Sequence, residues 1–362
     1  MILGMKAVLV LPLLLNFVQA FTPIITTESN DFHYSSSSSS QARRKSSPLF
    51  ETCIRQEESP NDTIEELSTG PPLPIKSLPC DANIFISRSR PFFDPSFDDM
   101  TKPQQHSYHI ARVGNKPDVF HLRGFLTKWE CSAIMNEAQY NYDDTGMNTA
   151  KSENGDSFRT NCKVAWLSDA RIGNICGIIG KAIENVFVTD EVKTAYGSHR
   201  SDLQVLNYKE KGGFVLHHDG HDRILTVIMY LNGVGETWLP LVEIDDDGKN
   251  SRNDEDEQIS SLQEALYKVQ SRSLQPGKDG VLISGSVKDD SFIDESSNCD
   301  EYEYNPHVVP VEAGDAIAFY SYGTECKGED WKSIHAGIPL EFKGEEGKWI
   351  ATSWYHAPSI TC

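Results

Sequence analysis

The chain has 362 residues, and its 53 acidic side chains outnumber its 33 lysines and arginines, which gives a net charge of −20 at pH 7. With 38% hydrophobic and 24% charged residues it can form a packed core, which excludes a globally disordered protein. The acidity argues against a nucleic-acid-binding protein, because phosphate binding needs clustered lysine and arginine.

The first twenty residues have the pattern of a secretory signal peptide. Lys6 precedes an apolar run at 7–18, and the small residue Ala20 marks a cleavage point. The run is too short for a membrane span, so no stable span is expected after cleavage, with a signal anchor as the alternative. The serine-rich stretch that begins at Phe21 resembles the second half of a bipartite presequence for a secondary plastid. We expect the endoplasmic reticulum lumen, with the plastid as the alternative.

Composition divides the rest of the chain. Residues 21–107 are rich in serine, proline and charge, and we expect a presequence and linker with little regular structure. The folded domain is expected at 108–362, with an acidic insertion at about 244–306 that holds one short helix near 260–269. Eight cysteines permit disulfides in the secretory pathway, and the absence of a CxxC pair argues against a zinc knuckle.

Two helices are predicted early in the domain, and strands follow. Alternation predicts a strand at 119–123, and Thr127 with Glu130 forms a capping box for the first helix. Helical spacing of apolar residues predicts a second helix at 169–187, with Ser168 as its N-cap. Period-two patterns then predict strands at 203–208, 213–219, 223–232, 316–322 and 348–356. Many short strands favour a barrel or a jelly roll.

The stretch GGFVLHHDGH carries three histidines and an aspartate in otherwise strand-like sequence. Side chains two residues apart share a face of a strand, so His217 and Asp219 point together and His218 points away. A His-x-Asp pair supplies two ligands of a 2-His-1-carboxylate site for Fe(II), which needs a distant histidine as the third. His335 is the candidate for that ligand. Lys348, on a downstream strand, is placed to hold a carboxylate of a co-substrate.

From about residue 115 to its end, the chain resembles the prolyl 4-hydroxylase alpha-subunit type of 2-oxoglutarate- and Fe(II)-dependent dioxygenase. The segments that carry the resemblance, in chain order, are FLTKWEC, LQVLNYKEKGGFVLHHD, RILTVIMYLNGVGETWLP, VVPVEAGDAIAFYS, SIHAGIP and KWIATSW. The resemblance implies a mainly β, α+β fold with a double-stranded β-helix, or jelly roll, core and flanking N-terminal helices.

The resemblance also implies roles for individual residues. His217, Asp219 and His335 would be the iron ligands, and Lys348 and Tyr208 would bind the C5 carboxylate of 2-oxoglutarate. The other implied positions are a pocket aromatic near the metal, Trp354, and four contacts to a peptide substrate, Arg159, Asn161, Arg223 and His356. Two spacings depart from the family. Only Gly-His-Asp follows the metal aspartate, where the family has a longer loop that shapes the peptide groove, and the interval from the second metal histidine to the lysine is longer.

The expected activity is hydroxylation of peptidyl proline, coupled to decarboxylation of 2-oxoglutarate to succinate, with O2 as oxidant and ascorbate keeping the iron reduced. The acceptor and any partner subunits stay open. One alternative is the same chemistry on another residue or on a small molecule, which the short Gly-His-Asp loop suggests. A second is a cupin-like metal-binding module without turnover, which would not need Lys348 and Tyr208.

Overall fold

The computed structural model describes residues 86–92, 94–96, 104–140, 148–149, 159–197, 199–220, 222–244, 258–285, 305–323, 328–339 and 347–357, all within the unit Pro72–Cys362. The strands are β1 Ile86–Phe92, β2 Gln104–Gly114, β3 Val119–Arg123, β4 Asn148–Thr149, β5 Arg159–Leu167, β6 His199–Arg200, β7 Leu203–His217, β8 Arg223–Tyr230, β9 Gly235–Leu239, β10 Val281–Gly285, β11 Val308–Pro310, β12 Ala316–Tyr320, β13 His335–Ile338 and β14 Lys348–His356. The helices are α2 Lys128–Gln139, α3 Ile175–Phe187, α4 Asp190–Tyr196, α5 Leu262–Ser271 and the short 3-10 helix η5 Trp331–Ser333.

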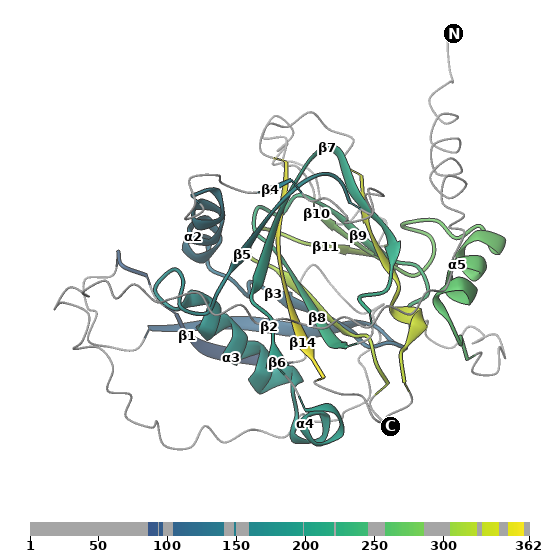
Figure 1. The fold of residues 1–362 in the computed structure, drawn as a ribbon, viewed down its shortest axis with the longest axis horizontal. Helices are drawn as coiled ribbons and strands as arrows, with labels where there is room; N and C mark the ends of the chain where they lie inside the picture. The colour runs from purple at the N-terminus through teal and green to yellow at the C-terminus, as the bar shows by residue number, and fades with distance from the viewer. Residues whose placement is uncertain are drawn as a thin grey trace, which may run out of the picture. The chain divides into compact units, whose positions relative to one another are not determined.

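One long strand joins the two halves of the sheet. One edge of β7 pairs with β5 as far as Phe214, whereas the other edge pairs with β14 up to Tyr208 and with β13 at Phe214 and His217. The strand order is β1-β2-β3-β12-β8-β14-β7 in the larger half and continues β13-β9-β10-β11 in the smaller half. Figure 1 shows β7 arching between these two groups of strands. A strand that changes partners in this way folds the sheet onto itself.

The two halves of the sheet share a buried core. Leu206, Ile228 and Ile350 of the larger half belong to one apolar cluster with Leu239 and Ile283 of the smaller half. Because alternate residues of a strand face opposite sides, these five positions mark the inward side of each half. The predicted jelly roll core is therefore confirmed.

Helices cover the outward side of the larger half. Val227 and Met229, which alternate with the inward residues of β8, pack in a second cluster with Ile134 of α2 and Ile179 of α3. On the smaller half, α5 contributes Ala265 to a third cluster. In Figure 1, α3 and α4 lie beside the larger group of strands and α5 lies at the other side of the domain. The helices cover the outer faces and leave the inner face for the site.

The two predicted helix starts had different outcomes. The capping box of α2 is present, since the Thr127 side chain accepts from the Glu130 backbone N–H at 3.1 Å and Glu130 accepts from the Thr127 N–H at 2.8 Å. The second helix begins at Ile175 instead of 169, and Ser168 does not cap it. Ile172 and Asn174 have φ values of 55° and 68°, which an α-helix cannot contain.

Both predicted domain boundaries need correction. β1 and the first residues of β2 form sheet within 21–107, the range expected to be linker. The range 244–306, expected to be an insertion with one helix, also contains β10, which pairs with β9 and β11 inside the smaller half of the sheet. β1 pairs with the next strand, β2, and β10 pairs with strands on both sides of the acidic stretch, so composition alone gave no sign of either strand.

A buried ion pair attaches β1 to the domain. Arg90, which is 3% exposed, donates to both carboxylate oxygens of Glu130 at 2.8 and 2.6 Å and to the Phe125 carbonyl at 2.9 Å. Arg90→Ala is expected to lower the free energy of unfolding by about 3–5 kcal/mol, because it leaves the Glu130 charge buried without its partner. Urea denaturation measures this, with the exposed Arg123→Ala as control. Equal stability of the two variants would show that this ion pair does not stabilise the domain.

The structure describes only part of the chain that bears on the possible disulfides and on a membrane span. Cys131, Cys162 and Cys176 are buried free thiols, and burial raises the pKa of Cys131 and Cys176 to about 12. The other five cysteines and the predicted signal peptide lie outside the described residues. None of the helices in the described part of the chain is long and apolar enough to cross a membrane.

Candidate active site

Three side chains from neighbouring strands converge on one point. His217 ends β7 and His335 begins β13, and the pairing of these strands places the two histidines opposite each other. Nε2 of His217 lies 3.6 Å and Nε2 of His335 lies 3.7 Å from the two carboxylate oxygens of Asp219. All three ligand atoms lie within 4.8 Å of one another, close enough for one ion to bind them all. His218 faces away, as alternation predicts, and packs on the Trp331 ring at 4.7 Å.

Backbone carbonyls orient both imidazole rings. Nδ1 of His217 lies 2.8 Å from the Val215 carbonyl, and Nδ1 of His335 lies 3.1 Å from the Ser333 carbonyl. A carbonyl only accepts, so each Nδ1 carries the proton and each Nε2 keeps its lone pair for a metal. Burial, together with the neighbouring His217, lowers the pKa of His335 to about 3, so the ring is neutral near pH 7. A neutral imidazole is the form that binds metals.

The carboxylate of Asp219 is fixed from the opposite side. Thr226 donates its hydroxyl to Oδ2, and the Trp354 indole N–H donates to the same oxygen at 3.1 Å. Burial alone would raise the pKa of Asp219, but His335, His217 and Thr226 outweigh it, and the pKa lies well below its usual value. Asp219 is therefore an ionised ligand held at a defined angle.

This donor set fits ferrous iron. Two imidazole nitrogens and one carboxylate oxygen form a 2-His-1-carboxylate triad, which binds Fe(II) on one face and leaves the opposite positions open for small ligands. Among the described residues, His217, Asp219 and His335 are the one such group, and their orientation by backbone carbonyls and by Thr226 is the outer shell that metal sites need.

A pocket extends from the triad along β14. Its lining residues besides the triad are Arg159, Leu206, Tyr208, Phe214, Thr226, Ile228, Thr237, Gly337, Lys348, Ile350, Thr352 and Trp354. Lys348, Ile350, Thr352 and Trp354 follow one another at period two, so they share the inward face of the strand. The pocket therefore has Trp354 and the triad at one end, a cation at the other and apolar walls between them.

Lys348 is buried at the far end of the pocket, where it is 2% exposed. Its ammonium donates to the Glu236 carbonyl at 2.6 Å and lies 5.9 and 5.8 Å from the ring centroids of Tyr208 and Tyr230. Burial lowers the pKa of Lys348 to about 8, although Glu236 opposes this effect. An ammonium has three donors, so this one can also bind a carboxylate that enters the pocket.

Tyr208 lies directly opposite Lys348 in the pairing of β7 with β14. Burial raises its pKa above the usual range, so the hydroxyl keeps its proton and can donate. The structure therefore places the two residues that were assigned to one carboxylate at the same end of the pocket.

Sequence reasoning missed several residues of this site. Thr237 is 2% exposed, lines the pocket and accepts a hydrogen bond from the Tyr230 hydroxyl at 2.7 Å. The Phe214 ring stacks on His217 with 3.6 Å between ring centroids. Thr226 fixes the metal carboxylate. Period two along β7, β8 and β9 shows that these side chains face inward, but only the strand pairing shows what they face.

Of the four predicted substrate contacts, two lie at the pocket. The Arg159 guanidinium lies 4.3 Å from the Phe214 ring centroid and lines the pocket. The Arg223 guanidinium lies 4.1 Å from the Trp354 ring centroid and donates to the Asp219 carbonyl at 3.1 Å. Stacking on an aromatic ring holds each arginine in place beside the triad.

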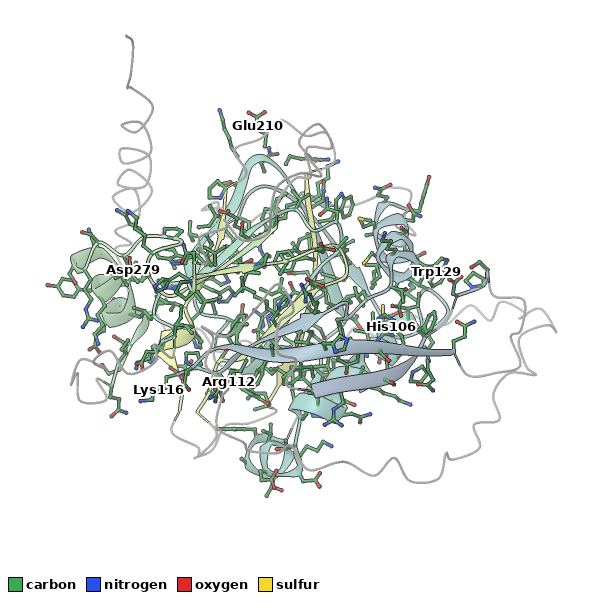
Figure 2. All side chains as sticks on the ribbon, turned by 180° about the vertical axis from the view of Figure 1, so that it is seen from behind. His106, Arg112, Lys116, Trp129, Glu210 and Asp279 are labelled. Atoms are coloured by element: carbon green, nitrogen blue, oxygen red, sulfur yellow. The ribbon has the colours of Figure 1, made fainter. Side chains whose placement is uncertain are left out.

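The other two predicted contacts do not line the pocket. Asn161 sits in an irregular part of β5 with a φ of 42°, and its side chain donates to the Glu210 carbonyl at 2.8 Å. Figure 2 labels Glu210 at the outer bend of β7. His356 lies 3.0 Å from the carboxylate of the exposed Asp222. The local backbone turns both side chains toward these partners, and their roles as peptide contacts stay predictions.

Comparison of the sequence with curated proteins gives two relatives that are named as prolyl 4-hydroxylases. Over 267 residues the chain is 26% identical to prolyl 4-hydroxylase 2 of Arabidopsis thaliana, which covers 69% of this chain and 71% of the relative. Over 291 residues it is 25% identical to a probable prolyl 4-hydroxylase 4 of the same plant, covering 76% and 75%. The chain resembles the prolyl 4-hydroxylase type of 2-oxoglutarate- and Fe(II)-dependent dioxygenase. The prediction of an enzyme of this type is thereby confirmed.

Two further comparisons complete this result. No family model matches the chain. Among solved structures, a viral collagen prolyl hydroxylase from Paramecium Bursaria Chlorella virus-1, in its 2-oxoglutarate complex, has 17% sequence identity and a TM-score of 0.39, and covers 67% of this chain and 96% of its own.

A dioxygenase of this type must bind a dicarboxylate, and Lys348 gives that step a pH dependence. Its pKa of about 8 means that the charged form, present below that pH, loses its proton as the pH rises. The KM for 2-oxoglutarate is expected to be flat below pH 8 and to rise by up to about tenfold per pH unit above it. Steady-state kinetics across this range measures the effect. A KM that stays flat to pH 9.5 would contradict the assignment.

Proposed function

We propose that the chain is a 2-oxoglutarate- and Fe(II)-dependent dioxygenase that hydroxylates proline in a peptide or protein, as a procollagen-proline 4-dioxygenase does. The observation that carries the proposal is a buried lysine, Lys348, that lines the same apolar pocket as a 2-His-1-carboxylate triad. A simple metal-binding module would use the triad alone. Such a module needs no cation at the far end of the pocket, so the buried Lys348 argues for a bound co-substrate.

The two ends of the pocket suit the two ends of 2-oxoglutarate. Its keto acid end binds metal, and its C5 carboxylate binds the ammonium of Lys348 and the hydroxyl of Tyr208. Leu206, Ile228 and Ile350 line the space between and exclude water from it. Low polarity along this path strengthens the contact between the carboxylate and the lysine.

The remaining residues position the reacting groups. His217 and His335 present Nε2 to the iron because their Nδ1 protons are held by carbonyls, and Asp219 is kept ionised and aligned by Thr226 and Trp354. When Fe(II), 2-oxoglutarate and O2 are bound, they supply the oxidising chemistry that converts a C–H bond to C–OH and 2-oxoglutarate to succinate and CO2. The protein contributes binding, orientation and a dry pocket.

The acceptor enters from the side where Arg159 and Arg223 lie. Support for proline as the acceptor residue comes from the relatives, two of which are named prolyl 4-hydroxylases. Support for the second candidate, another residue or a small molecule, comes from the short connection of three residues between Asp219 and Arg223. The two candidates share the iron site and differ at the entrance to the pocket.

Succinate release from 2-oxoglutarate and Fe(II), with and without proline-rich peptides, tests the proposal. We expect peptide to stimulate release and one oxygen atom to appear on a proline, read by mass spectrometry of the peptide. Succinate release that does not depend on any of these peptides would indicate that the acceptor is another residue or a small molecule. A protein that binds metal but not 2-oxoglutarate would be the non-catalytic module.

Ascorbate and the cellular location belong to the same proposal. Ascorbate is expected to restore activity that is lost when the iron is oxidised during turnover without acceptor.

The enzyme acts in the lumen of the endoplasmic reticulum, reached through the signal peptide at 1–20, with the plastid as the alternative. A fluorescent protein fused behind residues 1–50 tests this, since the two destinations differ in whether the label stays in the reticulum or enters the plastid.

A further inference from the structure

We propose that Trp166 forms an outer subsite that binds a proline-rich, extended segment of the acceptor polypeptide, beside the residue that is hydroxylated. This inference rests on the proposed function, because it names the part of the acceptor that determines recognition. It concerns a residue that neither the motifs nor the metal site accounts for.

Trp166 is an unusual surface residue. Three large hydrophobic side chains are exposed in the described part of the chain: Tyr140 at 78%, Trp166 at 48% and Tyr267 at 67%. Of these, Trp166 contacts an active-site residue, since its ring centroid lies 6.0 Å from that of Trp354 at an interplanar angle of 41°. A ligand that covers the exposed Trp166 ring would gain free energy from the apolar area it removes from water, and the ring lies beside an active-site residue where an acceptor could reach it.

The contact extends a row of stacked groups outward from the metal. The Trp354 indole donates to the metal carboxylate of Asp219 at 3.1 Å, and the Arg223 guanidinium lies 4.1 Å from the Trp354 ring centroid. Trp354 is 2% exposed, so it is covered by its neighbours, whereas the ring of Trp166 beyond it is open. An acceptor polypeptide that extends from the iron site past Arg223 and Trp354 would contact Trp166 next.

Strand pairing places Trp166 on the side of the sheet that carries the pocket. It lies opposite Gln204 of β7, and Gln204 lies opposite Thr352 of β14, which lines the pocket. Residues directly paired across antiparallel strands point to the same face. Gln204 also accepts a hydrogen bond from Arg159 at 3.2 Å, so Trp166 and Arg159 border the same entrance.

The chemistry of this entrance favours proline over a cation. Arg223 and Arg159 already place positive charge beside the two aromatic side chains, which disfavours a lysine or arginine of the acceptor there. A proline ring is apolar and flat, and proline-rich segments adopt the polyproline II helix before binding, so they lose little entropy in an aromatic-lined groove. The rise of this helix is about 3.1 Å per residue, so the 6.0 Å between the two tryptophan rings corresponds to about two residues.

The test compares two acceptor peptides with blocked ends. The long peptide continues with prolines for four residues on both sides of the hydroxylated residue, and the short peptide keeps one residue on each side. Trp166→Ala is expected to raise the KM for the long peptide about tenfold and to leave the KM for the short peptide within about twofold. Trp166→Phe, which keeps a ring, is expected to retain most of the affinity for the long peptide.

The control is Tyr267→Ala, which removes an exposed aromatic side chain from α5 and is expected to change neither KM. The KM for 2-oxoglutarate is expected to stay within about twofold in Trp166→Ala, because the co-substrate binds at the other end of the pocket. Equal effects on the long and the short peptide would show that Trp166 only supports Trp354, and that result overturns the proposal.

Three other outcomes also count against the subsite. If Trp166→Ala lowers the molar mass measured by light scattering, a second copy of the chain covers the ring instead of the acceptor. If the wild-type protein hydroxylates neither peptide while releasing succinate, the proline acceptor itself is wrong and the subsite fails with it. If the wild type hydroxylates both peptides and Trp166→Ala matches it on the long one, the subsite alone is wrong.

Discussion

Asp219→Ala is expected to abolish Fe(II) binding and to reduce succinate formation by at least about a hundredfold. The carboxylate is the one anionic member of the triad, and both imidazole nitrogens lie within 3.7 Å of its oxygens. Without it, two neutral histidines hold a divalent cation weakly. Equilibrium dialysis of Fe(II) and succinate release together measure the effect, and His217→Ala and His335→Ala are expected to behave alike.

A matched control is available three residues away. Asp222 carries an exposed carboxylate that pairs with His356 outside the pocket, so Asp222→Ala removes the same charge and leaves the triad intact. It is expected to keep one Fe(II) per chain. Fe(II) binding that survives in Asp219→Ala at the level of Asp222→Ala would show that the metal is held elsewhere.

Lys348→Met is expected to raise the KM for 2-oxoglutarate about a hundredfold, which corresponds to about 3 kcal/mol of lost binding free energy. Methionine keeps the volume of the buried stem, so the substitution removes the charge without opening a cavity. Fe(II) binding is expected to persist, because the ammonium lies at the opposite end of the pocket from the triad. Kinetics at several concentrations of 2-oxoglutarate, with Fe(II) in excess, separates the two effects.

The same substitution tests the pH dependence. In Lys348→Met the rise of KM above pH 8 should vanish, because the group that titrates is gone. Lys193→Met, which removes an exposed lysine from α4, serves as the control and should keep both the KM and its pH profile. A Lys348→Met variant with the wild-type KM would mean that another group binds the C5 carboxylate.

The sequence contains the local part of the metal site. Period two along one strand is sufficient to place His217 and Asp219 on one face, and the order of motifs points to His335 as the third ligand. It does not contain what holds Asp219, because Thr226 and Trp354 come from β8 and β14 and meet the carboxylate only through the pairing of those strands. Contacts of this kind depend on register, which a single sequence does not specify.

The fold could likewise be predicted where it depends on local sequence features and not where it depends on contacts between distant residues. Alternating strands and the capping box at Thr127 are local features, and they appear as expected. The ion pair that joins β1 to α2 links Arg90 and Glu130, which are 40 residues apart, and composition alone assigned that segment to a linker. The surroundings of Asn161 could not be predicted for a related reason: the strand is irregular at this residue, and its side chain contacts the bend of β7.

The most direct test of the whole account is an anaerobic titration of the wild-type protein with Fe(II) and then with 2-oxoglutarate. We expect one Fe(II) per chain, and one 2-oxoglutarate that binds tightly after the metal and weakly without it, because the triad and Lys348 each hold one end of the molecule. Binding of 2-oxoglutarate with the same affinity in the presence and absence of Fe(II) would contradict this arrangement.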